Sequence, residues 1–383
     1  MDYNNIVVCA PVTVPYVRRS GHGAAWWLGR VLRDLLRASG LTKSDIDGLC
    51  LSSFTLAPDG PAPFTQYVSL SPRLLEFLPF GGACGVIALR RATRAVQAGD
   101  ADIVACIAGD TNGANTFHDL LAQFSSFSRD HVWPYGAGGP NASFALLTQH
   151  AMRRTGATRE DFGKLCIAQR TWAQRNQLAL FRDPLTLDAY LTARPIASPL
   201  HLYDCVMPCA GADGFLVMTR DRAASLGLRG VRVLGTIERH NAFAEDPIQW
   251  RGGWAMDRDA LWQQASVGPA DIDLVQTYDD YPVISLLQFE DLGFCAKDAG
   301  AEFIRSHDFA PGGDLPHNTG GGQLSCGQAG AAGGFLGLVE ALRQLTGVAG
   351  ERAEPNARHA LVSGFGMINY DRGLCTAAAV LAA

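Results

Sequence analysis

The chain has 383 residues, of which 48% are hydrophobic and 18% are charged, and its formal net charge is −5. This composition is typical of a well-cored globular protein and excludes disorder. Charges of both signs are interspersed and no Lys/Arg run occurs, which argues against nucleic-acid binding. The length allows two domains of ordinary size or one large duplicated domain.

Alternating strand and helix patterns along the chain predict an α/β protein. In the first part we expect strands at 6–14, 45–54 and 103–108, and helices at 24–36 and 86–98. The order then restarts, with strands at 231–238, 272–277 and 359–366 and helices at 257–265 and 335–345. The sequence Asp-Ile-Asp precedes a predicted strand in both parts, at 45–47 and 271–273. We therefore predict a duplication, with residues 1–228 as one half and 229–383 as the other.

Residues 111–220 have no counterpart in the second half and are interpreted as an insertion. Long insertions of this kind serve as lids, binding loops or oligomer contacts. A helix is expected around 153–176, and the segment before it is rich in aromatic residues, namely Phe117, Phe124, Phe127, Trp133 and Tyr135.

Two glycine-rich loops run directly into predicted helices. One is residues 80–85, and the other, longer loop is residues 318–334. Glycine lets the backbone adopt φ > 0 and approach a neighbour closely. The free N–H groups of a helix start favour an anion or a developing oxyanion. We therefore expect both loops to converge on one shared pocket.

Neither loop matches a dinucleotide fingerprint or a phosphate-binding P-loop. The ten cysteines are scattered through strand and helix patterns, which favours reduced thiols and a cytoplasmic location. No metal site is expected, because Cys205 and Cys209 lack a second ligand pair. No stretch approaches the length of a membrane span and the acidic N-terminus does not resemble a signal peptide, so no membrane association is expected.

The chain resembles the thiolase superfamily, in the style of its sterol-carrier-protein-thiolase and lipid-transfer branch. The carrying motifs, in chain order, are residues 81–89 with 97–99, Asn176 with 181–186, 195–200, 212–214, 278–281 with 289–293, the 318–334 loop and 364–366. The resemblance implies a duplicated five-layer αβαβα fold, a homodimer and acyl-CoA substrates. It implies no permanently bound cofactor, with coenzyme A itself as substrate or product. Some members of this branch pair with a small zinc-ribbon/OB-fold protein.

The catalytic positions depart from the thiolase pattern. The position of the acylated cysteine holds Gly82, and Cys84 lies two residues further along. Gln328 replaces the usual histidine, Val362 replaces the second cysteine, and Tyr278 replaces the residue that heads the middle motif. These departures argue against an ordinary ketoacyl thiolase.

The candidate nucleophile is Cys84, because a helix N-terminus lowers the pKa of a thiol; it is equally well a small core residue. Gln328, together with backbone N–H groups of the turns at 82–84 and 320–322, would donate to a thioester or enolate oxygen. Alternatively, its amide bridges the backbone of the loop.

Tyr278 is a candidate proton donor or a packed tyrosine at a strand end. Asp279 is a candidate base or a helix cap. His317, beside the second loop, is a further candidate, although a histidine in a loop is more often simply hydrogen-bonded. Arg182 would bind a CoA phosphate or pair with Asp183, and Gly320, Gly321 and Gly322 are candidate CoA-binding residues.

The sequence thus predicts a thiolase-type acyltransferase that makes or cleaves a carbon–carbon bond next to a CoA thioester. Two alternatives stay open. One is a retro-aldol lyase for side-chain acyl-CoA thioesters, which needs no acylated cysteine. The other is a non-catalytic CoA-ester-binding subunit.

Overall fold

The computed structural model describes residues 3–113, 116, 119–120, 125–137, 139–369 and 372–383. Two of the aromatic residues noted in the insertion, Phe117 and Phe124, lie outside the described residues. Within the described part, no helix is both long enough and apolar enough to traverse a bilayer.

A nine-stranded mixed sheet has the order β3-β2-β4-β7-β1-β8-β11-β10-β9. Its strands are β1 (Ile6–Val17), β2 (Gly48–Ser52), β3 (Leu74–Phe77), β4 (Ile103–Asp110), β7 (Ala210–Thr219), β8 (Val231–His240), β9 (Leu274–Gln276), β10 (His359–Asn369) and β11 (Arg372–Ala382). A separate small ribbon pairs β5 (Pro195–Ala197) with β6 (Leu200–His201).

The helices of the first half are α1 (Ala24–Ser39), α2 (Pro61–Val68) and α3 (Cys84–Ala98). The segment between β4 and β7 carries α5 (Ser126–His131), α6 (Pro140–Thr155), α7 (Arg159–Gln174) and α8 (Leu187–Leu191), and α9 (Arg220–Ser225) follows β7. The second half adds α10 (Trp254–Ala265), α11 (Pro282–Asp291), α12 (Gly300–Ser306), α13 (Gly322–Cys326) and α14 (Gly333–Thr346).

The same strand order occurs in both halves of the sheet. The series β1-β7-β4-β2 has antiparallel, antiparallel and parallel pairings in turn. The series β8-β11-β10-β9 repeats these pairings in the same sequence. Strand β3 extends the first series, and β1 pairs with β8 to join the two. The division at 228/229 itself stays a prediction, because the sheet is continuous across it.

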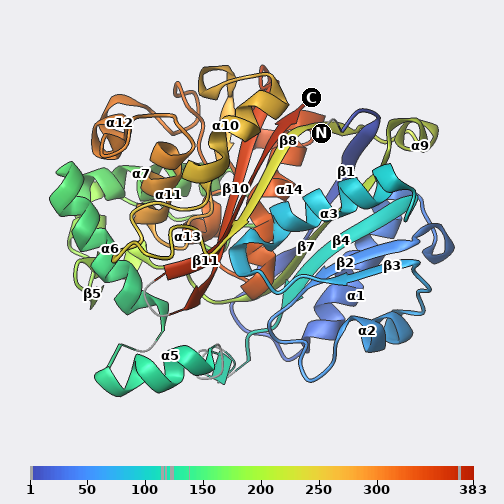
Figure 1. Ribbon diagram of the computed structural model, residues 1–383, viewed down its shortest axis with the longest axis horizontal. Coiled ribbons are helices and arrows are strands. Elements are labelled where there is room, and N and C mark those ends of the chain that lie inside the picture. The colour runs from blue at the N-terminus through green and yellow to red at the C-terminus, as the bar shows by residue number, and fades with distance from the viewer. Residues whose placement is uncertain (1–2, 114–115, 117–118, 121–124, 138, 370–371) are drawn as a thin grey trace.

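The two halves of the nine-stranded sheet pack on either side of α3 and α14, and further helices cover their outer faces (Figure 1). Helices and strands thus alternate in five layers, as the αβαβα expectation requires. One hydrophobic core lies between the sheet and the paired helices α3 and α14. A second lies under α1 and α2, and a third under α7, α10 and α11. Neighbouring residues of β10 enter different cores, Val362 the central one and Leu361 the outer one, because side chains alternate along a strand.

The helix starts of the two halves pack backbone to backbone. A Cβ on Gly85 of α3 would lie 2.1 Å from the carbonyl oxygen of Gly334 in α14. Only glycine permits such an approach. This crossing brings the loop before α3 against the loop before α14.

The inserted segment differs from its sequence prediction in two respects. The single helix expected around 153–176 is two helices, because Gly156 ends α6 in the left-handed conformation at φ 68°. The range 111–220 also includes β7, which is a central strand of the sheet and occupies the same place in the first half as β11 in the second.

Candidate active site

A cavity of about 430 Å³ lies where the two glycine-rich loops meet. Gly81 and Gly82 of the first loop line it, and so do Gln328 and Gly330 of the second. The wall also includes residues that follow β9, among them Tyr278 and Asp280, and residues of the inserted segment. The two loops therefore share one cavity, as the sequence predicts.

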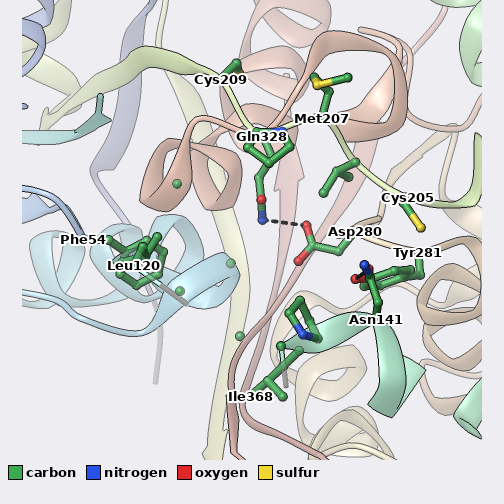
Figure 2. Close-up of a pocket in the computed structure, with 18 of the residues that line it drawn as sticks. Phe54, Leu120, Asn141, Cys205, Met207, Cys209, Asp280, Tyr281, Gln328 and Ile368 are labelled. Carbon is green, nitrogen blue, oxygen red and sulfur yellow. Dashed lines mark hydrogen bonds between the residues drawn. The ribbon is translucent and has the colours of Figure 1, made fainter. Parts of the chain in front are cut away.

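Tyr278, Asp280 and Gln328 form a hydrogen-bonded cluster in the wall. Figure 2 shows the bond between Gln328 and Asp280. The Gln328 Nε2 donates to Asp280 Oδ1 at 2.9 Å and to Tyr278 Oη at 3.2 Å. Tyr278 also hydrogen-bonds Asp280. Both amide hydrogens of Gln328 are thus engaged within the cluster. Gln328 thus holds Tyr278 and Asp280 together in this arrangement, and its role as an oxyanion donor stays a prediction.

The cluster combines a proton donor with a carboxyl group that titrates near neutrality. Burial raises the pKa of Asp280 to about 7, and Asp279 adds to the rise, while the Tyr278 hydrogen bond opposes it. Burial, and next the charge of Asp280, raise the pKa of Tyr278 well above its usual value. Tyr278 therefore stays protonated and donates, and Asp280 is suited to accept and return a proton at neutral pH.

The ring of Tyr278 packs directly against Gly82. A Cβ on Gly82 would lie 1.9 Å from Tyr278 Cε2 and 2.3 Å from the carbonyl oxygen of Phe365. No side chain fits at position 82 while Tyr278 keeps this place. The tyrosine thus excludes a cysteine from the position where the thiolase pattern has one.

Asp110 ties the second loop to the end of β4. This buried carboxylate accepts hydrogen bonds from Ser53 Oγ at 2.8 Å, from the Thr55 N–H at 2.7 Å and from the Ala331 N–H at 2.7 Å. A Cβ on Gly330 would lie 2.2 Å from Asp110 Oδ2. The first half of the chain therefore fixes the loop that carries Gln328.

Backbone hydrogen bonds hold Gln328 from the other side. Its N–H donates to the Met207 carbonyl, and its carbonyl accepts the Cys209 N–H, each at 2.9 Å. Cys209 and Met207 also line the cavity. The inserted segment thus forms part of the wall and sets the position of Gln328.

Cys84 lies outside the cavity. Its side chain is buried at the start of α3, and the Sγ donates to the Ala331 carbonyl at 3.1 Å. Burial raises the pKa of this thiol to about 12. The expected lowering by the helix N-terminus is therefore outweighed by desolvation. This geometry does not favour Cys84 as a nucleophile.

Asp279 and His317 are also buried away from the cavity. Asp279 accepts from the Gln323 N–H at 2.9 Å and thus caps α13, not the next helix in the chain, α11, as the structural alternative from sequence had it. Burial raises its pKa to about 6. The Nε2 of His317 hydrogen-bonds Thr277 Oγ1 at 2.7 Å, and burial lowers the pKa of His317 to about 3. His317 is therefore neutral at physiological pH.

The residues predicted to bind CoA do not line the cavity. Arg182 is exposed. The Gly320 carbonyl accepts from Asn176 Nδ2 at 2.7 Å, Gly321 has φ 106°, and a Cβ on Gly322 would lie 2.2 Å from Asp279 Oδ2. These three glycines thus build a tight turn around the Asp279 cap. Their role in CoA binding stays a prediction. By its sequence position after the glycine turn at 364–366, Tyr370 is a further and weaker candidate for proton transfer; it lies outside the described residues.

Sequence reasoning named Asp279 as the carboxylate of the site and missed Asp280. The signal was present, because side chains two residues apart at a strand end point to the same side, which pairs Tyr278 with Asp280. Asp110 and the cavity-lining Arg170 carried no such signal. Among the described residues, no group of three or more His, Cys, Asp or Glu side chains is arranged to hold a metal ion.

Comparisons with known proteins agree with this architecture. Residues 247–376 match the family model described as Thiolase C-terminal domain-like. The 17-hydroxy-3-oxo-4-pregnene-20-carboxyl-CoA lyase of Mycobacterium tuberculosis is 28% identical over 348 residues, covering 87% of this chain and 89% of that protein. A structure titled monomeric SCP2-thiolase like protein type 1, from Mycobacterium smegmatis, covers all of this chain and 78% of its own, with a TM-score of 0.72. These similarities, together with those to proteins named sterol carrier protein 2, support the SCP2-thiolase-like branch of the thiolase superfamily.

The Mycobacterium smegmatis structure is 15% identical to this chain and therefore supports the fold alone. A second structure, titled "Ltp2-ChsH2(DUF35) aldolase", has a TM-score of 0.83 and 25% identity, and the match covers 99% of this chain and 98% of its own. These similarities indicate a thiolase-like enzyme, and the wall of its cavity contains Tyr278, Asp280 and Gln328.

Proposed function

We propose that this enzyme cleaves or forms a carbon–carbon bond next to a CoA thioester, and that it does so as a retro-aldol lyase. One observation carries the proposal. Tyr278 fills the space beside Gly82, and the cavity offers Asp280, a carboxyl group with a pKa of about 7, in place of a cysteine at that position. The lyase and aldolase named among the similar proteins support the same class of reaction.

The reaction would begin with a thioester that carries a hydroxyl group on its β-carbon. The Asp280 carboxylate accepts the hydroxyl proton, the bond between the α- and β-carbons breaks, and the β-carbon leaves as a ketone or aldehyde. The bonding electrons pass to the α-carbon and form the thioester enolate. The Tyr278 hydroxyl donates a hydrogen bond to the enolate oxygen. Asp280 then returns its proton to the α-carbon, which yields the shortened acyl-CoA.

Thiolase-type acyl transfer through Cys84 would act on the same kind of bond. It requires a thiolate within reach of the thioester carbonyl. The burial of Cys84, its pKa of about 12 and its position outside the cavity wall give that version less support. A non-catalytic CoA-ester-binding role is opposed by the titratable group that faces the cavity.

The test is an assay with CoA thioesters that bear a β-hydroxyl on a tertiary carbon. We expect release of a ketone and of a shortened acyl-CoA in equal amounts. Liquid chromatography with mass detection measures both products. Asp280→Asn should slow the release of both products at least about a hundredfold while the variant still binds the thioester. Product formation at an unchanged rate in that variant would contradict the proposal, and binding without turnover in the wild type would favour the non-catalytic role.

We further propose that the enzyme is a homodimer. Strand β3 forms one edge of the sheet, and its outward side chains Leu75 and Phe77 are exposed, as is Tyr67 of the neighbouring α2. An apolar edge strand of this kind favours pairing with a second copy. Light scattering should give twice the monomer mass, and Phe77→Lys should shift it to that of the monomer.

A small zinc-ribbon/OB-fold partner protein and a cytoplasmic location complete the proposal. The DUF35 subunit in the similar structure supports such a partner. All ten cysteines are free thiols, which supports a reducing compartment. Copurification with the product of a neighbouring gene would test the partner, and fractionation would test the location.

A further inference from the structure

Arg170 is a buried cation in the wall of the cavity. It lies on α7, and 7% of its surface is exposed. Its Nε donates to Ser325 Oγ at 2.9 Å, and its Nη1 donates to the Asp183 carbonyl at 3.3 Å. The guanidinium also lies over the rings of Phe181 and Tyr203, at 5.4 and 5.8 Å from their centroids.

None of these contacts is an ion pair, and the nearby charge that acts on Arg170 is that of Asp183. Within the described part of the chain, no carboxylate lies within ion-pair distance of the guanidinium, and its Nη2 makes no hydrogen bond. Asp183 offers its backbone carbonyl, while its side chain is exposed. The ring faces and two neutral acceptors hold the guanidinium in a fixed orientation against the cavity.

The carboxyl groups of Asp110 and Asp280, which also line the cavity, are each hydrogen-bonded by neighbouring side chains or backbone N–H groups. Asp110 accepts several hydrogen bonds from Ser53, Thr55 and Ala331. Asp280 is bonded to Gln328 and Tyr278. Arg194 also lines the cavity, but it is exposed to solvent. Arg170 is thus the buried arginine of the described wall whose contacts at bonding distance are all with neutral groups.

A buried cation of this kind is costly unless an anion neutralises it. Burial lowers the pKa of Arg170, yet an arginine remains protonated at any physiological pH. A carboxylate entering the mostly apolar cavity faces the same desolvation cost. Pairing the two removes both costs, and the planar guanidinium suits a carboxylate.

We propose that Arg170 binds a carboxylate carried by the acyl part of the thioester, so that the substrate is a CoA ester of a dicarboxylic acid. The inference rests on the proposed function for the identity of the ligand. The phosphates of CoA are the other source of an anion. They are strongly hydrated and separated from the thioester by the pantetheine arm, whereas Arg170 is buried in the wall of a mostly apolar cavity, over the rings of Phe181 and Tyr203.

Binding is measured first, so that the test does not depend on turnover. The probes are pairs of non-hydrolysable acyl-CoA thioethers of short and medium chain length, one ending in a carboxylate and one in a methyl group. Isothermal titration calorimetry gives the dissociation constant of each probe for the wild type, Arg170→Met and Arg175→Met. Arg175 is the matched control, because it follows the same helix and is exposed.

We expect the wild type to prefer the carboxylate member of one pair by about tenfold to a hundredfold, and Arg170→Met to lose that preference. Arg175→Met should keep it. The readout is the ratio of the two dissociation constants. If Arg170→Met perturbs the cavity wall and weakens both ligands equally, this ratio does not change and the result can still be interpreted. Arg170→Lys should restore part of the preference, since it keeps the charge and loses the planar geometry.

Two results would overturn the inference. An equal affinity of the wild type for both members of every pair would exclude a carboxylate partner. A loss of affinity in Arg170→Met that is the same for both members, and that disappears with pantetheine thioethers lacking the phosphates, would assign Arg170 to the CoA phosphates. Failure of the proposed lyase chemistry is recognised separately, as normal carboxylate preference without any carbon–carbon cleavage.

Discussion

The ring of Tyr278 occupies the place that a side chain at position 82 would need, with 1.9 Å between Tyr278 Cε2 and a Cβ built on Gly82. In the thiolase pattern this position carries the acylated cysteine. Gly82 therefore leaves the space that the Tyr278 ring fills, and a proton donor lies where the thiolase pattern has a nucleophile. The neighbouring Asp280 then supplies the acid–base function that the reaction needs.

Gly82→Cys should inactivate the enzyme rather than turn it into a thiolase. The added side chain must displace the Tyr278 ring or the β10 backbone at Phe365, which we expect to cost about 1–3 kcal/mol of stability. Thermal unfolding and kcat/KM with a β-hydroxyacyl-CoA check this outcome. In the double variant Gly82→Cys, Tyr278→Ala the stability should recover while activity stays low, because the space is restored and the donor is absent.

Asp280→Asn and Asp279→Asn are a matched pair at adjacent positions. Loss of the acid–base group should lower kcat about a hundredfold to ten-thousandfold in Asp280→Asn. Asparagine still caps a helix, so Asp279→Asn should keep most of the activity. Steady-state kinetics decide between the two carboxyl groups. A larger loss of kcat in Asp279→Asn than in Asp280→Asn would show that Asp280 is not the base.

The pH profile follows from the raised pKa of Asp280. If its carboxylate is the base, kcat/KM rises with pH up to the folded pKa of about 7 and is level above it. Between the unfolded value and this pKa, the folded state binds more protons, so the free energy of unfolding falls as the pH rises. Asp280→Asn should remove this contribution, and urea titrations of both proteins at about pH 5 and at about pH 7 measure the difference.

Gln328→Ala should impair the reaction through its neighbours. The amide donates to Asp280 Oδ1 at 2.9 Å and to Tyr278 Oη at 3.2 Å, so its removal frees both side chains. We expect kcat to fall about tenfold to a hundredfold with a smaller change in KM. The pKa of Asp280 should rise, because a hydrogen bond to its charged form is lost. An unshifted pH profile would show that Gln328 does not act on Asp280.

The duplicated α/β fold follows from the sequence because its strands are short apolar runs in a repeated order. Three strands of the sheet, β3, β7 and β11, were not predicted. Strand β7 contains Gly211, Asp213 and Gly214, which interrupt the apolar pattern, and tertiary packing holds it in the sheet. The central crossing of Gly85 and Gly334 accounts for the glycine-rich loops, which were the strongest sequence signal.

Individual side chains of the site were harder to predict. Cys84 has the right sequence position for an activated thiol, yet its pKa depends on burial by the second loop, which lies far away in the chain. Arg170 has no distinguishing local pattern, because the neutral contacts of its guanidinium are a property of the assembled cavity. Tyr278 and Gln328 were predicted on the family pattern, and the structure places both in the cavity wall.

The central claim is that the carbon–carbon bond is broken without an acylated cysteine. The most direct measurement combines the turnover of Cys84→Ala with peptide mass spectrometry of the wild type quenched during reaction. We predict that the variant keeps its turnover within about threefold, since Cys84 only packs against the second loop, and that no cysteine peptide carries an acyl group. Loss of turnover in Cys84→Ala together with an acyl adduct on the wild-type Cys84 peptide would contradict the account.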